Sequence, residues 1–330
     1  MKLSVLDQGI VSKGNTAQDT MNNTIELAKL ADELGYNRIW YSEHHGTSGI
    51  SCTAPEILVA HIASITKNIR VGTGGVMLMH YAPLKVAEVF NMLSTLYPNR
   101  IDFGVGRAPG GDYASMRALS QGREPEMHNL YTKISETLAF ISNNLPIENQ
   151  YKDTFAAPVG SPLPESWLLG SSGNSAVQAG NLGMGYSFAQ FISGQLPKSV
   201  FDAYIKSFVP SSFMEKPQIN VGYFAVVADT KEEAEYEAAS LDLTLLNLSK
   251  GIDNKLVSPE EALSYSYSEL DKMRIKANRN RILVGSAKEV ADILRSHEED
   301  YGVNEAVIVG INHSNEAKLR TYRLLAKELL

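Results

Sequence analysis

The sequence predicts an α/β protein folded as a (β/α)8 TIM barrel, a single domain over residues 1–330 with insertions over the C-terminal mouth. Apolar segments rich in β-branched and aromatic residues alternate with segments of helical periodicity, and the first four strands start about every 33 residues. The 330 residues suffice for eight such repeats. No Gly-x-Gly-x-x-Gly follows the first strand, which weakens the alternative, a doubly wound open sheet.

The first third of the chain contains three βα units and a fourth strand. Thr16 begins a capping box with Asp three residues later, and Gly35 supplies the C-terminal stop of the first helix. Pro55 and Pro83 occupy the favoured first position of the next two helices. The four strands are expected over residues 3–7, 37–41, 69–73 and 101–106.

The repeat is interrupted in the rest of the chain. Residues 108–125 are rich in Gly, Ser, Arg and Pro and predict a long loop over the barrel mouth. Residues 249–280 form a second, polar insertion that we expect at the same end. Residues 282–286 lead into a helix. The remaining strands are expected over residues 166–170, 185–191, 218–228 and 305–310, which makes eight in all.

The composition is typical of a globular protein with an ample core. Hydrophobic residues make up 44% of the chain and charged residues 20%. The net charge of -7 disfavours a nucleic-acid or anionic-membrane partner, and no apolar run approaches the roughly 18 residues that span a bilayer. Cys52 is the only cysteine, so no intramolecular disulfide forms, and we expect a cytoplasmic protein.

The most informative stretch is the second strand and its end. Ile39, Trp40 and Tyr41 predict a buried strand, and Glu43, His44 and His45 follow at once. Titratable side chains that follow a buried strand must be paired or solvated, and α/β proteins keep their chemistry at the C-terminal ends of strands. The alternative is a structural Glu–His hydrogen bond under a loop. Taken alone, the run favours neither interpretation.

Ser171-Ser172-Gly173-Asn174-Ser175 lies between a predicted strand and a predicted helix. The N-terminus of a helix offers unpaired N–H groups and the positive end of the helix dipole, so hydroxyl residues there can cradle a phosphate. Ordinary N-capping by serine is the alternative, although three serines exceed what one cap requires. Arg107, also at a strand end, could supply the matching positive charge, unless it forms only a surface ion pair.

Two further features concern ligands. Gly72-Thr73-Gly74-Gly75 interrupts a strand, which suggests a bulge or the close approach of a flat ligand; loose barrel packing is the alternative. His44 and His45 are adjacent and cannot both face one metal from a strand end. Because no carboxylate-rich ligand set accompanies them, we expect no metal site. Cys52 lacks a basic neighbour and is expected to be inert.

These motifs together resemble the bacterial luciferase-like flavin-dependent monooxygenases, over nearly the whole chain. The resemblance rests on residues 39–45, 71–75, 100–107, 169–172 and 284–310. It implies a barrel that binds reduced FMN at its C-terminal mouth, supplied by a separate flavin reductase. It further implies that the flavin reacts with O2 to a C4a-peroxide, which oxygenates a small organic substrate.

The resemblance also implies roles for residues. His44 matches the catalytic histidine and Glu43 a residue that lines the flavin pocket. Gly74 and Gly75 match a pair joined by a cis peptide bond behind the isoalloxazine ring. The cofactor-binding positions at the phosphate end are Arg107, Gly170, Ser171, Ser172 and Ser175. Relatives form dimers through helices early in the barrel, so a homodimer is expected.

The sequence departs from the family pattern at two positions that bear on the reaction and the substrate. Light-emitting α subunits carry a reactive cysteine where Gly106 stands and an acidic residue where Ser171 stands. Both differences argue against light emission and a long-chain aldehyde substrate. Two alternatives to a two-component monooxygenase stay open: a flavin-binding protein without turnover, and a deazaflavin-dependent hydride-transfer enzyme.

Overall fold

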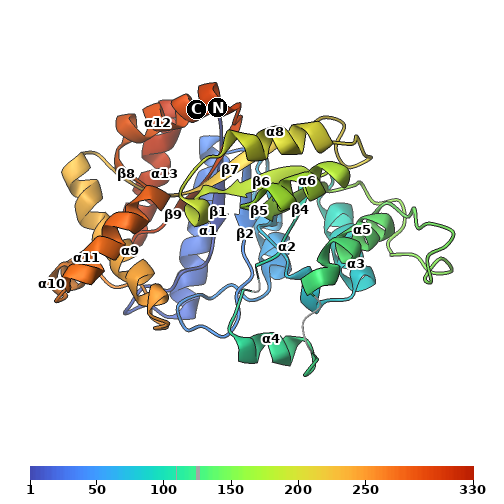
Figure 1. The fold of residues 1–330 in the computed structure, drawn as a ribbon, viewed down its shortest axis with the longest axis horizontal. Helices are drawn as coiled ribbons and strands as arrows, with labels where there is room; N and C mark the ends of the chain where they lie inside the picture. Colours follow the sequence, from blue (N-terminus) through green and yellow to red (C-terminus); the bar gives the residue numbers. More distant parts are fainter. Residues whose placement is uncertain (109, 124–126) are drawn as a thin grey trace.

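The structure is a computed structural model that describes residues 1–108, 110–123 and 127–330 (Figure 1). Its centre is a closed barrel of eight parallel strands, as the alternation of strands and helices predicted. The last strand of the ring pairs with the seventh and the first, which closes the barrel. In ring order the strands are β1 (Lys2–Asp7), β2 (Arg38–Tyr41), β3 (Arg70–Thr73), β4 (Ile101–Gly106), β5 (Glu165–Gly170), β6 (Gly185–Ala189), β7 (Ile219–Ala228) and β9 (Glu305–Gly310).

A ninth strand, β8 (Ile282–Ser286), lies outside the ring, where the sequence indicated only the approach to a helix. It forms because β7 is longer than its neighbour. The first residues of β7 pair with β6 up to Gly222, and residues Phe224–Ala228 extend past the end of β6. β8 takes the edge that β6 leaves and satisfies its backbone groups.

Helices surround the barrel and follow their strands (Figure 1). Thr16 forms the predicted capping box with Asp19, and Gly35 ends that helix in the left-handed region with a φ of 84°. The larger helices are α1 (Ala17–Leu34), α2 (Pro55–Ile65), α3 (Pro83–Leu96), α5 (Leu130–Ile141), α6 (Gly173–Asn181), α8 (Lys198–Ser207), α9 (Lys231–Ser249), α11 (Glu269–Asn278), α12 (Ala287–Tyr301) and α13 (Asn315–Leu329). The smaller elements are α4 (Tyr113–Leu119), α7 (Gln190–Ser193), α10 (Pro259–Ser264) and the 3-10 turns η1 (Leu78–His80), η2 (Met127–Asn129) and η3 (Arg279–Arg281).

The first insertion lies over the C-terminal mouth, as predicted. Gly110 accepts a hydrogen bond of 2.7 Å from the backbone N–H of His45, in the loop after β2. The insertion contains α4, a helix that we predicted as loop, and three of its residues, 109, 124 and 125, lie outside the described part of the chain. A smaller correction concerns β6, which ends at Ala189, because α7 begins at Gln190 instead of the strand continuing to residue 191.

The second insertion reaches the mouth near both of its ends. Asn280 accepts a hydrogen bond of 2.9 Å from the side chain of Gln190, on the helix that follows β6. Asp253 accepts a hydrogen bond of 3.0 Å from the backbone of Ser48, and Leu256 pairs with Ser12 in the loop after β1. The rest of the insertion is helical, and α10 and α11 pack against α9 on the side of the barrel (Figure 1). Among the described residues, no helix is both long and apolar enough to cross a bilayer.

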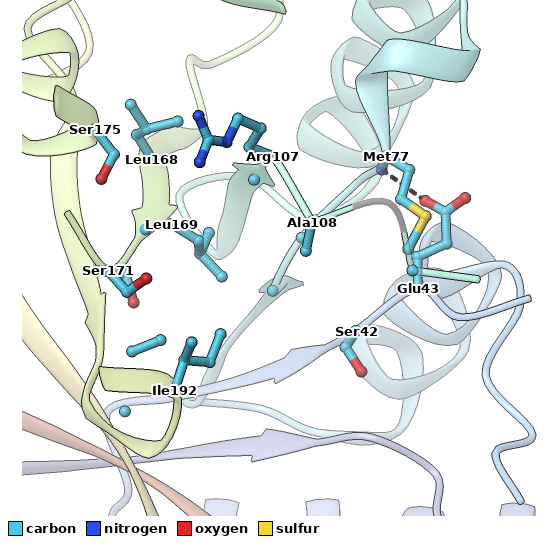
Figure 2. A pocket seen from close by; sticks show the side chains of 18 of the residues that line it. Ser42, Glu43, Met77, Arg107, Ala108, Leu168, Leu169, Ser171, Ser175 and Ile192 are labelled. Carbon is cyan, nitrogen blue, oxygen red and sulfur yellow. Dashed lines mark hydrogen bonds between the residues drawn. The ribbon is translucent and has the colours of Figure 1, made fainter. Parts of the chain in front are cut away.

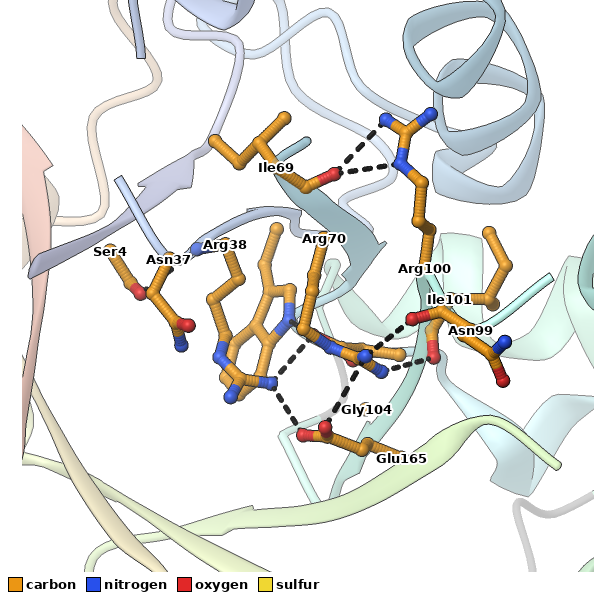
Figure 3. Close-up of polar contacts among 12 residues, drawn as sticks. Ser4, Asn37, Arg38, Ile69, Arg70, Asn99, Arg100, Ile101, Gly104 and Glu165 are labelled. Atoms are coloured by element: carbon orange, nitrogen blue, oxygen red, sulfur yellow. Dashed lines mark hydrogen bonds and ion pairs between the residues drawn. The ribbon is translucent and has the colours of Figure 1, made fainter. Parts of the chain in front are cut away.

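A network of buried charges closes the N-terminal end of the barrel (Figure 3). Arg38 is 2% exposed and lies 2.7 Å from both Asp102 and Glu305. Arg70 also binds Asp102, and both arginines reach Glu165. A buried charge is tolerated only when paired in this way, and here every partner comes from the first residues of a strand. Because these charges fill the N-terminal end of the barrel, a ligand site is expected at the C-terminal end.

The next layer of the barrel is filled by aromatic rings and close backbone contacts. The rings of Trp40 and Trp167 meet edge to face at 5.6 Å. A Cβ on Gly104 would lie 1.9 Å from the carbonyl oxygen of Thr73, so glycine lets β3 and β4 pack closely. A cavity lies above this layer, at the C-terminal mouth.

Candidate active site

The cavity has a volume of about 800 Å³ and lies among the C-terminal ends of the strands and the loops that follow them (Figure 2). That volume is within the range of roughly 300–1,000 Å³ that is typical of ligand and cofactor pockets. All the site residues that the sequence pointed to line this one cavity. They are Glu43, His44, Gly74, Gly75, Arg107, Gly170, Ser171, Ser172 and Ser175.

One wall of the cavity is the backbone of Gly74 and Gly75. The peptide bond between them is cis, as the resemblance implied. A Cβ on Gly74 would lie 2.8 Å from Leu6 Cδ1, and one on Gly75 would lie 2.8 Å from the carbonyl oxygen of Gly104. Neither position accepts a side chain, so bare backbone forms a wall against which a flat ring can lie.

The turn from β5 into α6 forms the serine-rich end of the cavity. Ser172 is the N-cap of α6 and forms a capping box with Ser175. The hydroxyl of Ser175 donates to the backbone carbonyl of Ser172 at 2.8 Å and lies 3.0 Å from the Tyr186 hydroxyl. Gly170 is required beside it, because a Cβ there would lie 2.2 Å from Ser175 Oγ. The hydroxyls of Ser172 and Ser175 therefore form hydrogen bonds that cap α6, which agrees with the N-capping alternative.

Ser171 and Arg107 differ from the two capping serines. Neither side chain has a hydrogen-bond or ion-pair partner among the described residues, yet both line the cavity. Figure 2 shows Ser171 and Ser175 on the same side of the cavity, with the guanidinium of Arg107 near that side. A free hydroxyl, a free guanidinium and the N-terminus of α6 form a set of donors suited to a phosphate group. The residues present therefore fit the phosphate of FMN.

Glu43 lines the opposite side of the cavity, but both of its carboxylate oxygens are occupied (Figure 2). Oε2 accepts from the backbone N–H of Met77 at 2.9 Å, and Oε1 accepts from the hydroxyl of Tyr81 at 2.5 Å. Oε1 also lies 2.8 Å from His45 Nε2. Glu43 thus ties the end of β2 to the segment after β3, and His45 is its partner and does not line the cavity.

His44 lines the cavity, and its Nδ1 lies 3.1 Å from the hydroxyl of Ser42. Burial, and then the nearby His45, lower the pKa of His44 to about 4. The ring is neutral at pH 7, because charging it at this buried position is unfavourable. Nε2 of His44 has no partner among the described residues.

Several cavity residues were missed by the sequence reasoning. Gln8 directly follows β1, and Ser187 lies on β6. Alternate residues of a strand point into the barrel, and this alternation could have indicated both. His128 and Tyr131 reach the cavity from η2 and α5, and no motif in the sequence marks them. Cys52 is outside the cavity and buried, and burial raises the pKa of its thiol to about 12, so it is inert, as expected.

Comparison with known proteins places this site in a family. A family model described as luciferase-like monooxygenase matches residues 1–305. The chain is 35% identical to the N-acetyl-S-alkylcysteine monooxygenase of Bacillus subtilis strain 168, over 100% of this chain and 98% of that protein. The chain therefore belongs to the luciferase-like, flavin-dependent monooxygenases.

Solved structures agree with the fold. The crystal structure of apo-MsnO8 is 36% identical and superposes with a TM-score of 0.90, covering 99% of this chain and 98% of that one. The oxygenating constituent of 3,6-diketocamphane monooxygenase from Pseudomonas putida, solved in complex with FMN, is 21% identical with a TM-score of 0.71. The match covers 100% of this chain and 98% of the chain in that structure. At 21% identity it supports only the assignment of the fold.

Proposed function

We propose that the protein is the oxygenase component of a two-component system, which takes reduced FMN from a separate reductase and uses O2 to oxygenate a small organic substrate. The observation that carries the proposal is that Arg107 and Ser171, which have no side-chain partner among the residues the structure describes, line one cavity with His44. The first two suit a phosphate and the third suits proton handling. The bare backbone of Gly74 and Gly75 lines the same cavity.

Reduced FMN, when bound, supplies the two electrons with which one atom of O2 enters the substrate while the other leaves as water. The protein's own residues bind the flavin and orient it. Ser171, Arg107 and the N-terminus of α6 would hold the phosphate, and the Gly74–Gly75 wall would support the ring. The apolar lining, which includes Met77, would keep bulk water from the reacting atoms.

The proposal extends to partners. No dinucleotide fingerprint follows the first strand, so we assign reduction of the flavin to a second protein. The net charge of -7 supports a small-molecule substrate over a nucleic acid. We further propose a homodimer, and we propose the reducing cytoplasm as its compartment because the only cysteine is a buried thiol.

Ligand titration tests the cofactor. Oxidised FMN, anaerobically reduced FMN, riboflavin and a deazaflavin would each be titrated into the protein, with binding followed by fluorescence or calorimetry. We expect reduced FMN to bind more tightly than riboflavin, since riboflavin lacks the phosphate. A preference for the deazaflavin over both forms of FMN would instead support the hydride-transfer alternative.

A single-turnover reaction tests the chemistry. The complex with reduced FMN would be mixed with 18O2 and an N-acetyl-S-alkylcysteine, chosen because a relative is named for that substrate. Mass spectrometry would measure 18O in the product, and hydrogen peroxide would be measured in parallel. Flavin oxidation at the rate of free reduced FMN, with no labelled product from this or any other tested thioether, would favour a flavin store without turnover.

A further inference from the structure

Among the described residues, Ser42 is the side chain that lies within hydrogen-bonding distance of the His44 ring, and the barrel fixes its place. Along β2, Arg38 and Trp40 point into the barrel, where they meet Asp102 and Trp167, and Ser42 continues this alternation. Ser42 is 5% exposed and lines the cavity. Its hydroxyl lies 3.1 Å from His44 Nδ1, a hydrogen-bonding distance.

Backbone hydrogen bonds hold both residues of the pair, and the N–H of Ser42 donates to the carbonyl of Asp7 at 3.5 Å. The N–H of His44 donates to the carbonyl of Cys52 at 3.0 Å, which fixes the loop after β2. The side chain of His44 makes no other hydrogen bond with the described residues. Ser42 is therefore the one described side chain that can orient the imidazole through a ring nitrogen.

The hydrogen-bond acceptors around Ser42 and His44 determine which atoms of the two side chains carry protons. The pKa of His44, about 4, means that one ring nitrogen carries a proton at pH 7 and the other does not. Among the described residues Nδ1 is the only acceptor bonded to the Ser42 hydroxyl. If Nδ1 carried the proton, the hydroxyl proton of Ser42 would have no partner among the described residues, at a cost for a buried group. Donation from Ser42 to Nδ1 places the ring proton on Nε2.

We propose that Ser42 is a positioning residue that fixes His44 as the Nε2–H tautomer, so that His44 offers a proton to the reacting atoms in the cavity. The inference deepens the proposed function and rests on it, because the donor acts only if the cavity is an active site. His44 then serves first as a hydrogen-bond and proton donor, and Nδ1 stays an acceptor turned towards Ser42.

Nitrogen-15 NMR of labelled histidine tests the tautomer without any turnover. The His44 signals would be assigned by their loss in His44→Gln. We expect a protonated, pyrrole-type Nε2 and an unprotonated, pyridine-type Nδ1 in the wild type, and a mixture of tautomers in Ser42→Ala. Ser42→Thr keeps a hydroxyl and should restore the single tautomer. Ser187→Ala is the matched control, since Ser187 is a buried serine of the same cavity and forms no hydrogen bond with His44.

The reaction supplies the second readout. Loss of a neutral hydrogen bond is worth roughly a factor of 2 to 10, so Ser42→Ala should lower the ratio of product to hydrogen peroxide by that factor. Affinity for FMN should change by less than about twofold, because the phosphate donors lie elsewhere, and Ser42→Thr should recover the ratio.

Two NMR results would overturn the inference: a protonated Nδ1 in the wild type, or a His44 tautomer unaffected by Ser42→Ala. A product ratio that does not move in Ser42→Ala although the tautomer becomes mixed would also overturn it. Failure of the proposed function would look different. In that case the NMR would show the expected tautomer in the wild type, while no variant, wild type included, gave oxygenated product.

Discussion

His44 and His45 are neighbours in the chain with different surroundings, and the difference predicts different effects of substitution. His44 lines the cavity, whereas His45 binds Glu43 at 2.8 Å. His44→Ala should lower oxygenation by about 10²–10⁴-fold, with the electrons lost to hydrogen peroxide, and leave FMN affinity nearly unchanged. His45→Ala should cost about 1–3 kcal/mol of unfolding free energy, because it leaves a buried carboxylate without one partner.

Product, peroxide and FMN affinity would be measured for both variants, with urea unfolding as the measure of stability. The assignment is wrong if His45→Ala uncouples the reaction while His44→Ala retains wild-type coupling. Normal coupling in both variants would argue that neither histidine handles the proton.

The buried state of His44 also predicts how stability depends on pH. Its pKa in the folded protein is about 4, below the value of about 6.5 for an unfolded chain. Between these values the unfolded state binds the proton first, so stability contributed by neutral His44 is present above pH 6.5 and is lost as the pH falls towards 4. His44→Gln should reduce the loss of unfolding free energy between pH 7 and pH 4.5 by about 2 kcal/mol.

Chemical unfolding of both proteins at the two pH values would measure this difference. His61→Gln, at an exposed position on α2, is the matched control and should follow the wild type. An identical loss in His44→Gln and the wild type would show that the His44 ring is not held neutral.

At the scale of elements, the start of α6 separates two kinds of serine. The hydroxyl of Ser171 has no hydrogen-bond partner in the described part of the chain, whereas Ser172 caps the helix. A hydrogen bond to a charged group is worth about 1.5–3 kcal/mol, so Ser171→Ala should weaken FMN binding about tenfold or more. Ser172→Ala should mainly destabilise the helix, by about 1 kcal/mol. Riboflavin binding should be almost indifferent to Ser171→Ala.

Calorimetric titration with both ligands, together with thermal unfolding, separates these effects. If Ser171→Ala weakened FMN and riboflavin equally, the serine would be structural and not a phosphate donor.

The same elements show how far the sequence alone can lead. Polar residues directly after apolar segments, as at Glu43 and Ser171, indicated where strands end, and strand ends in a barrel share one face. That reasoning brought every candidate residue to one cavity. It could not reveal that the carboxylate of Glu43 accepts hydrogen bonds from Met77 and Tyr81, or that burial lowers the pKa of His44. Both depend on contacts between segments that are distant in the sequence. β8 was missed for the same reason, because its partner is the overhang of β7.

At the scale of the whole molecule, closure of the barrel joins the two ends of the chain. Lys2 lies beside Glu305 in the ladder between β1 and β9, and the hydroxyl of Ser4 donates a hydrogen bond to the Glu305 carboxylate. The charges of Arg38 and its partners are satisfied only when strands from both halves are in place. We therefore propose that residues 1–330 fold as one domain, with no half of the barrel stable by itself.

The outer surface of the barrel supports the proposed homodimer. Ile57 on α2 and Met92 and Leu96 on α3 are 66%, 51% and 56% exposed, on two helices that pack against each other. Burying such apolar side chains between two copies would be favourable by about 25 cal/mol per Å². We predict that the wild type is a dimer at micromolar concentration, and that Met92→Glu combined with Leu96→Glu gives a monomer, because the paired interface would bury like charges.

Sedimentation velocity measures the change in mass. Ile205→Glu on α8 is the matched control, since Ile205 is similarly exposed at 53% on another side of the barrel, and this variant should stay dimeric. FMN affinity should be retained in the monomeric variant, because the cavity is built from strand ends and loops of one chain. A wild-type monomer at micromolar concentration would contradict the prediction, and a dimer that survives both glutamates would place the interface on a different face.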